Sequence, residues 1–197
     1  MTYTLYGTAK SRAMRVIWCL NELDQPFDHI PCGPRAKEIQ ALTPSGKIPV
    51  LQVDETTLTD STAILSFLAD RHGALTHPPG TTERAQQDAH MLFVLDEVES
   101  LLWTAARHTF ALPEDLRVPQ IKDSLRAEWP TSLARLSERV GDGPYLCGET
   151  FTIADIVASH CLGWAKMARF DWDDPVLAAY NDRCRARPAF KTSQTAP

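Results

Sequence analysis

A proline at the beginning of an apolar strand is the feature that most limits how this chain can fold. Residues 46–51 read Gly-Lys-Ile-Pro-Val-Leu, and the run after the proline has the apolar character of a buried strand. Because Pro49 has no amide hydrogen, it fits only the first position or the edge of a sheet. Polar residues 54–55 then predict a tight turn, and residues 56–59 a second strand. A cis peptide bond before Pro49 would turn the chain sharply and leave the backbone of Ile48 to pair with an extended peptide.

The predicted hairpin leads directly into a helix with a polar first turn. Asp60 and Ser61 precede an apolar helical face formed by Ile64, Leu65 and Leu68. Aspartate and serine at a helix start accept hydrogen bonds from backbone amides, and the remaining amides there attract a carboxylate. Taken alone, a strand proline is typical of sheet edges, and an Asp-Ser pair is typical of helix caps.

The residues before the hairpin predict a βαβ unit. Two strands joined by a helix imply a right-handed crossover and a parallel pair. Together with the hairpin and its helix, the order β-α-β-α-β-β-α is a thioredoxin-like arrangement. The expected elements are strand 3–6, helix 11–24, strand 27–30, helix 36–42, strands 48–53 and 56–59, and helix 61–71.

The proline and the polar helix start together indicate a family. Ile48-Pro49 followed by Asp60-Ser61, in this order and at this spacing, resembles the glutathione-binding half of the cytosolic glutathione transferases. In that family the bond before the proline is cis and pairs with the cysteinyl backbone of glutathione, and the acidic-serine pair holds the γ-glutamyl end. The resemblance implies that these four residues and Lys47 bind glutathione as a co-substrate.

The loop after the first strand is expected to act on the thiol of glutathione, because active sites of such sheets lie at the carboxyl ends of the strands. The thiolate is the nucleophile, and a free thiol with a pKa of about 8.5 is only a few per cent ionised at pH 7. A hydroxyl donor, a helix N-terminus and a nearby cation favour the charged form. Residues 11–15, Ser-Arg-Ala-Met-Arg, resemble the Ser-Arg-x-x-Arg pattern of bacterial members. Ser11 is therefore the predicted catalytic residue, and Ser11 and Arg12 are predicted to bind glutathione.

Other groups in this loop remain open as the activator. Counting back from Arg15 puts the serine position of some family classes on Lys10 instead of Ser11. Tyr6 is the second candidate, since other classes use a tyrosine near this point, and Thr8 or a backbone amide is a further possibility. A further alternative is that Ser11 only caps the helix. The loop contains no cysteine, which argues against the classes that form mixed disulfides with glutathione.

Two polar residues before Gly46 can reach the glycyl carboxylate of glutathione. They are Lys37 and Gln40, both in the short helix expected over residues 36–42. The alternative is that they lie on an ordinary solvated face of this helix, where surface charges have no specific partner.

The second half of the chain predicts a helical domain. Strand patterns stop after a linker-like segment that contains two prolines and a glycine, and apolar residues then recur at helical spacing. The expected fold is an α/β thioredoxin-like N-terminal domain plus an all-α helical bundle. Its domains are expected over residues 1–75 and 83–197, with a linker over 76–82; the helices are expected over 83–110, 120–140, 153–169 and, near the end, 175–187.

The helix expected from residue 153 begins with a specific capping pattern. Thr152 and Asp155 have the spacing of a capping box, and Phe151 before them can act as a hydrophobic staple. The helix that follows is apolar on nearly every side, which is typical of the central helix of a bundle. The passage resembles the folding motif in the helical domain of glutathione transferases, so its role is structural.

Four residues of the helical half are candidates for a pocket between the domains that takes a small hydrophobic electrophile. Trp103, Arg107 and Phe110 recur at helical spacing, and Trp164 belongs to the apolar helix. Each of them also suits the core or a dimer surface. The resemblance further implies a homodimer whose isologous interface uses the helices expected over residues 61–71 and 83–110.

Composition excludes several other classes of function. The net charge is -5 with both signs interspersed, which argues against nucleic acid or an anionic membrane as the main partner. Without a long apolar run or a signal-peptide pattern, the expected location is the cytoplasm. Five cysteines and six histidines are scattered without metal-ligand spacing, so no metal is expected.

The resemblance to this family implies a glutathione S-transferase of the EC 2.5.1.18 type, with a role in detoxification. It would stabilise the thiolate of glutathione and transfer it to a small hydrophobic electrophile, whose identity the sequence leaves open. Two alternatives stand beside this one. The first is a non-catalytic, transferase-like binding or stress protein, and the second is a glutathione-dependent peroxidase or dehalogenase.

Overall fold

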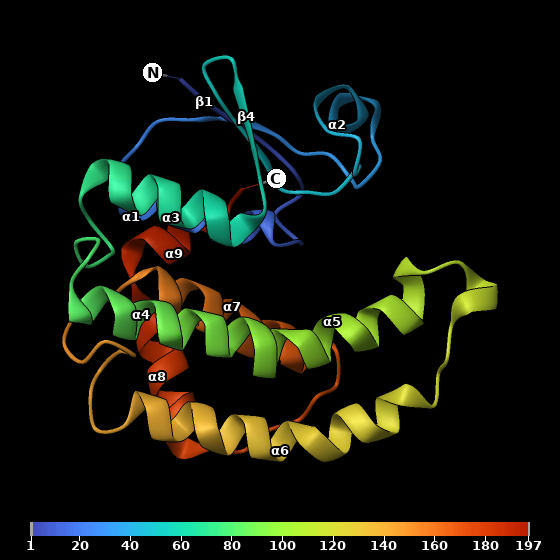
Figure 1. Ribbon diagram of the computed structural model, residues 1–197, viewed down its shortest axis with the longest axis vertical. Helices are drawn as coiled ribbons and strands as arrows, with labels where there is room; N and C mark the ends of the chain where they lie inside the picture. Colours follow the sequence, from blue (N-terminus) through green and yellow to red (C-terminus); the bar gives the residue numbers. More distant parts are fainter. Residues whose placement is uncertain (1, 197) are drawn as a thin grey trace. The chain divides into compact units, whose positions relative to one another are not determined.

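The computed structural model describes residues 2–196, which form two compact units (Figure 1). The first unit consists of the residues up to Pro79 together with those from Arg185 onward, and the second runs from Gly80 to Cys184. The last residues of the chain therefore belong to the same unit as the first, and the first unit is discontinuous in sequence. None of the helices within residues 2–196 is long and apolar enough to cross a membrane.

A four-stranded mixed sheet forms the centre of the first unit. The strands lie in the order β2-β1-β3-β4; β1 pairs with β2 in parallel and with β3 antiparallel, and β3 pairs antiparallel with β4. Side chains along β1 alternate between buried and half-buried, as expected when one face of a sheet carries most of the core. The predicted thioredoxin-like arrangement is confirmed. The strands are β1 (Tyr3–Tyr6), β2 (Asp28–Ile30), β3 (Val50–Val53) and β4 (Thr56–Thr59).

Helices α1 (Ala13–Glu22) and α3 (Ser61–His72) pack against each other in this unit, and α2 (Lys37–Leu42) lies between β2 and β3 in the chain. The central residues of α1 are fully buried because α1 also contacts α9 (Pro188–Ser193). Helix α1 begins two residues later than the sequence predicts. Ser11 and Arg12 form a turn instead, closed by the bond from the Ser11 amide to the Thr8 carbonyl at 3.0 Å.

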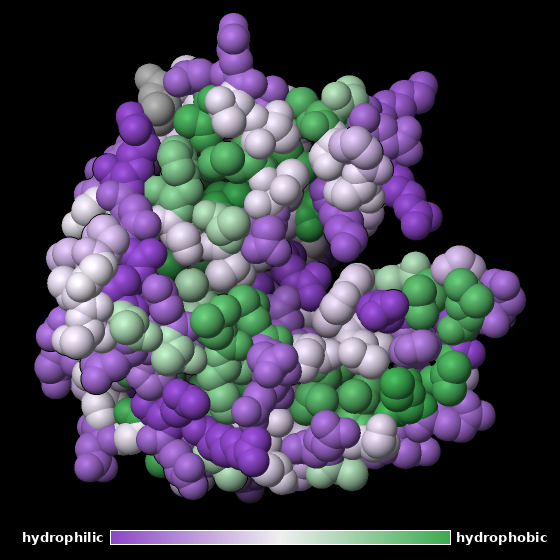
Figure 2. All heavy atoms as spheres, viewed as in Figure 1, coloured by the Kyte–Doolittle hydropathy of each residue, from purple (hydrophilic) through white to green (hydrophobic). Residues whose placement is uncertain are grey.

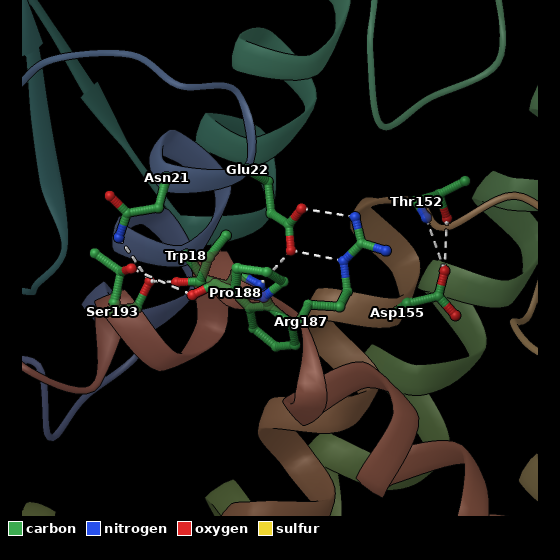
Figure 3. Close-up of polar contacts among 10 residues, drawn as sticks. Trp18, Asn21, Glu22, Thr152, Asp155, Arg187, Pro188 and Ser193 are labelled. Carbon is green, nitrogen blue, oxygen red and sulfur yellow. Dashed lines mark hydrogen bonds and ion pairs between the residues drawn. The ribbon is translucent and has the colours of Figure 1, made fainter.

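Helix α9 is fastened to α1 by polar contacts (Figure 3). The Glu22 carboxylate accepts hydrogen bonds from Nε and Nη2 of Arg187, both at 2.7 Å, and from Trp18 Nε1 at 2.9 Å. The neighbouring residue on α1, Asn21, donates through its Nδ2 to Ser193 Oγ at 2.7 Å. We call these five residues the α1–α9 clamp.

The second unit is helical throughout its regular structure. A continuous helical stretch starts at Thr82 and ends at Ala111, and its α-helical turns alternate with two π-helical segments. Helix α6 continues through Pro130 without a break. The elements are α4 (Thr82–Phe93), η1 (Val94–Glu99), α5 (Ser100–Ala106), η2 (Arg107–Ala111), η3 (Glu114–Leu116), α6 (Ile121–Val140), α7 (Ile153–Met167) and α8 (Pro175–Ala186), whose last residues belong to the first unit.

Helix α7 is the core helix of the second unit, as predicted. The capping box is confirmed: Thr152 and Asp155 exchange side-chain and backbone hydrogen bonds at its start. The buried Asp155 carboxylate also accepts from the Leu146 amide and the Tyr180 hydroxyl, each at 2.9 Å. Burial raises the pKa of Asp155, and the donors from Leu146 and Thr152 offset part of this effect.

Candidate active site

Gly7 is the point at which three parts of the first unit meet. It follows the last residue of β1 and has φ +139°, a conformation that side chains rarely adopt. A Cβ atom at this position would lie 3.0 Å from the Cβ of Ala13 and 3.3 Å from the Cβ of Ile48. The end of β1, the start of α1 and the Ile48–Pro49 turn are therefore in direct contact, and only glycine fits between them.

The Ile48–Pro49 peptide bond is cis, as the resemblance implies. Pro49 is buried and Ile48 half-buried. On the side before them, the Lys47 amide donates to Ser45 Oγ at 3.3 Å, and on the other side β3 begins at Val50. The backbone of Ile48 thus lies two residues before the start of β3, at the turn where the sequence predicts an extended peptide to pair.

The start of α3 has the predicted cap. Asp60 has φ +68°, and its carboxylate accepts from the amides of Thr62 and Ala63 at 2.9 and 3.1 Å. Ser61 is buried, and its hydroxyl accepts a hydrogen bond from Arg15 Nη1 at 3.3 Å. Helix N-termini favour an anionic group, and the first residue of this helix is a buried serine whose hydroxyl a guanidinium contacts.

Arg15 is a residue of this site that the sequence reasoning missed. Its side chain is fully buried although it carries a permanent charge. It links α1 to the first residue of α3 through Ser61, 46 positions away. Its charge within the otherwise apolar face of α1 was the available signal, because buried charges are rare unless they are paired.

The Ser11 hydroxyl is engaged within its own loop. It donates to the Thr8 carbonyl at 2.7 Å and accepts from the Ala13 amide, the first of α1, at 3.1 Å. The side chain is half-buried, whereas Lys10 in the same loop is exposed. Ser11 therefore stabilises the start of α1, and its proton is directed to a carbonyl. Rotation about χ1 is needed before it can donate to a ligand.

Tyr6 points to a different partner. Its hydroxyl donates to Gln52 Oε1 at 2.8 Å on the neighbouring strand β3. Both side chains are half-buried on the face of the sheet opposite to that of Tyr3 and Leu5, which are buried.

Basic residues surround the chain before Ile48. Lys37 opens α2 and is exposed, and Lys47 is exposed as well. Gln40 Nε2 donates to the carbonyl of Arg35 at 3.0 Å. The Arg35 side chain lies against Gly46, with its Cγ 3.1 Å from where a Cβ of Gly46 would be. Arg35 is a second residue that the sequence reasoning missed, since it lies in a turn without periodicity.

The four candidate pocket residues all lie in the second unit. Trp103 is half-buried on α5, and Trp164 is half-buried on α7, where its ring meets His160 at 6.4 Å in an edge-to-face contact. Arg107 and Phe110 are exposed on η2. Because a π-helical turn has more residues than an α-helical turn, the predicted α-helical stripe does not continue from Trp103 to Phe110.

The described residues 2–196 contain no group of three His, Cys, Asp or Glu side chains that could hold a metal ion. The second unit has an open hollow of about 590 Å³ lined by α4, η1 and Arg139 of α6. Apolar surface gathers over this part of the helical stretch (Figure 2), where Leu92 is 62% exposed.

Comparison with known proteins decides the family. The glutathione S-transferase N-terminal domain profile matches residues 5–79, and the C-terminal domain profile matches residues 83–186. This chain belongs to the glutathione S-transferase family. The two matches cover both the unit with the cis proline and the helical unit.

Its relatives include glutathione S-transferases of plants and bacteria. Glutathione S-transferase F13 of Arabidopsis thaliana is 30% identical over 173 residues, covering 79% of this chain and 77% of the relative. Glutathione S-transferase GstA of Escherichia coli O157:H7 is 27% identical over 160 residues, covering 79% and 76%. The solved glutathione transferase of Methylococcus capsulatus str. Bath has a TM-score of 0.85 at 25% identity and covers 98% of this chain and 97% of its own. The glutathione S-transferase fold and, in general terms, glutathione transferase activity are thereby supported for this chain.

Proposed function

We propose that this glutathione S-transferase binds glutathione on its first unit, ionises the thiol and transfers the thiolate to a small hydrophobic electrophile. One observation carries the proposal. At Gly7 the loop after β1, the start of α1 and the cis Ile48–Pro49 turn are in contact, so a thiol bound along Ile48 would lie beside the loop that contains Ser11.

The binding roles follow from the groups at each end of that turn. The cysteinyl backbone of glutathione pairs with the backbone of Ile48 next to Pro49. Its γ-glutamyl carboxylate meets the Ser61 amide and hydroxyl at the start of α3, and its amine meets the Asp60 carboxylate.

The glycyl carboxylate of glutathione is assigned to the basic residues before the turn. Lys37 and Gln40 are the residues that the sequence suggests for this carboxylate. Lys47, which is predicted to bind glutathione, and Arg35, whose side chain lies against Gly46, are added to them. A planar guanidinium can bind a carboxylate through two parallel hydrogen bonds, which a lysine cannot do.

Ionisation of the thiol is assigned to Ser11, Arg12 and the N-terminus of α1. Ser11 rotates from the Thr8 carbonyl to the sulfur and donates its proton as a hydrogen bond, which stabilises the thiolate. The thiol proton is released to solvent. The sulfur lone pair then forms a bond to the electrophilic carbon, and the leaving group departs with its electron pair.

We further propose that Trp103, Arg107, Phe110 and Trp164 contact the electrophile. Their aromatic surface suits an apolar molecule, and Arg107 suits its developing negative charge. A cytoplasmic homodimer that acts in detoxification completes the proposal. The exposed Leu92 at the rim of the open hollow supports the dimer, because a second copy would cover it.

A second candidate function is a non-catalytic glutathione-binding or stress protein. The observation in its favour is the Ser11 hydroxyl, whose proton is already donated to the Thr8 carbonyl at 2.7 Å. A site that kept this bond would bind glutathione without ionising it. A glutathione-dependent peroxidase or dehalogenase would use the same residues as the transferase.

The test is a titration of glutathione into the wild type and Ser11→Ala, followed by heat and by the ultraviolet absorbance of the thiolate. We expect both proteins to bind, and the pKa of the bound thiol to be about one unit higher in Ser11→Ala, the size expected for one charge-assisted hydrogen bond. Ser124→Ala is the matched control, since its hydroxyl also donates to a backbone carbonyl, at 2.9 Å on α6.

Each result decides between the functions. If the thiol is ionised equally in wild type and Ser11→Ala, another group stabilises the thiolate, and Tyr6 and Thr8 are the next candidates. Binding without ionisation in the wild type would support the non-catalytic alternative. Absence of glutathione binding by the wild type would overturn the proposal.

A further inference from the structure

We propose that His29 is a positioning residue of the glutathione site, which holds the loop of Ser11 in place by donating a hydrogen bond to the Gly7 carbonyl. This inference rests on the proposed function, because the position of the loop matters only if the loop acts on a bound thiol. His29 lies in the middle of β2, and its Nε2 is 2.7 Å from the oxygen of Gly7.

The hydrogen-bond partner determines which ring nitrogen carries a hydrogen. A backbone carbonyl can only accept, so Nε2 is the donor. Nδ1 of His29 is buried and has no hydrogen-bond partner among residues 2–196. The contact with the Gly7 carbonyl is therefore the side-chain hydrogen bond through which His29 acts on this loop.

The same strand end fixes Gly7 and Thr8 by two backbone bonds. The Gly7 amide donates to the carbonyl of Ile30 at 3.1 Å, and the Thr8 amide donates to the carbonyl of Cys32 at 3.0 Å. Neither of these two bonds involves a side chain. The bond from His29 is the one side-chain contact of the three, and it binds the carbonyl of the Gly7–Thr8 peptide, whose amide is held by Cys32.

Gly7 adjoins two other parts of the site. A Cβ atom built on it would lie 3.0 Å from the Cβ of Ala13 and 3.3 Å from the Cβ of Ile48, so the peptide that His29 contacts lies next to both the start of α1 and the cis turn. The next residue is Thr8, whose carbonyl accepts the Ser11 hydroxyl at 2.7 Å. The direction of the Thr8 carbonyl decides how readily Ser11 leaves it for the thiolate. His29 thereby acts on the thiol through Gly7, Thr8 and Ser11 without touching the substrate.

Three variants test this role. His29→Phe keeps a ring of similar size and removes the donor, whereas His29→Gln keeps a side-chain N–H at a comparable reach. The control is His72→Phe, because His72 also contacts β1 of the same sheet through a side-chain hydrogen bond, between its Nε2 and the Tyr3 hydroxyl at 2.9 Å. For each protein we would measure the unfolding midpoint, kcat and KM, and the pH titration of the bound thiol at saturating glutathione.

In His29→Phe we expect the pKa of the bound thiol to rise by about half a unit to one unit and kcat/KM to fall about threefold to tenfold, since one net hydrogen bond is worth a factor of this size. His29→Gln should recover most of the loss. His72→Phe should lower the unfolding midpoint without moving the pKa of the thiol. An unchanged thiol pKa in His29→Phe, or an equal rise in His72→Phe, would overturn the inference and leave His29 a structural role alone.

One readout keeps this inference separate from the proposed function. The amide resonances of residues 7–12 report the loop in the absence of glutathione. We expect them to shift or broaden in His29→Phe, and to return toward their wild-type positions in His29→Gln. If the wild type binds no glutathione, the proposed function fails and these resonances alone decide: unchanged resonances in His29→Phe would overturn the link between His29 and the loop.

Discussion

Removal of the Arg187 side chain should destabilise the first unit far more than removal of an arginine from an exposed ion pair. Arg187 and Glu22 are 165 positions apart and joined by two hydrogen bonds of 2.7 Å. The Glu22 side chain is 7% exposed and that of Arg187 29% exposed, so the carboxylate cannot recover its hydration when the arginine is lost. Helix α9 would also lose its main polar attachment to α1.

The size of the effect follows from this partial burial. Breaking a fully buried ion pair by removing one partner costs about 3–5 kcal/mol, and an exposed pair is worth about 0–1 kcal/mol. Glu22 keeps its hydrogen bond from Trp18 Nε1, which leaves the carboxylate partly satisfied. We therefore expect Arg187→Ala to lower the free energy of unfolding by about 2 kcal/mol, between those two limits.

The matched control is Arg135→Ala in the second unit. Arg135 and Glu97 are 2.6 Å apart, but their side chains are 56% and 34% exposed. If distance alone determined stability, Arg135→Ala would cost as much unfolding free energy as Arg187→Ala. Because this pair is more exposed, we expect a much smaller loss, of about 0.5 kcal/mol. Comparison of the two variants thus separates the contribution of burial from that of distance.

The assay is urea unfolding of the full chain by circular dichroism, with amide hydrogen exchange of α1 and α9 to locate the loss. A double-mutant cycle with Glu22→Gln isolates the coupling of the pair. We expect faster exchange in both helices of the clamp and unchanged exchange in α7. If Arg187→Ala costs no more than Arg135→Ala, or if α1 keeps its protection, the reasoning from burial is refuted.

Two further predictions concern other positions. Gly7→Ala should weaken glutathione binding more than tenfold, because its Cβ would lie 3.0 Å from Ala13. The control is Gly80→Ala at φ +84°, whose Cβ would meet nothing within 4 Å and which should leave binding unchanged. Equal affinities of the two variants by calorimetry would contradict this prediction. Because burial raises the pKa of Asp155, the folded state retains its proton to higher pH than the unfolded state, so the stability of wild type relative to Asp155→Asn should fall as pH rises from about 4 toward neutral. Urea unfolding across this range checks the sign, and a rising difference would contradict it.

The parts of the fold that sequence could predict are those set by local chemistry. Pro49 cannot donate to a sheet, and β3 begins directly after it at Val50, two residues later than the strand expected from residue 48. Thr152 with Asp155 specifies a helix start within four residues, and this capping box is confirmed. The start of α1 was misplaced because Ser11 and Arg12 are compatible with a helix and with the turn that forms. The hydrogen bond from the Ser11 hydroxyl to the Thr8 carbonyl depends on local geometry, which the residue type alone does not determine.

What could not be predicted depends on contacts between distant segments. Nothing near Glu22 in sequence indicates that Arg187 will be its partner, because the pairing is decided by the packing of α9 on α1. The contact between Arg15 and Ser61 could not be predicted for the same reason. The π-helical turns η1 and η2 are hidden for another reason: a search for α-helical periodicity places one residue too few in each such turn.

The candidate site combines backbone groups with side chains, and this determines which substitutions should matter most. The contacts proposed for glutathione use the backbone of Ile48 together with Asp60 and Ser61 at the start of α3. Their positions, however, depend on side chains that hold the backbone: His29 on Gly7, Arg15 on Ser61, and the α1–α9 clamp on α1. Specificity for glutathione and tuning of its thiol should therefore be separable in this protein. Changes at holding residues such as His29 should move the thiol pKa, while the residues that form the binding surface set the affinity.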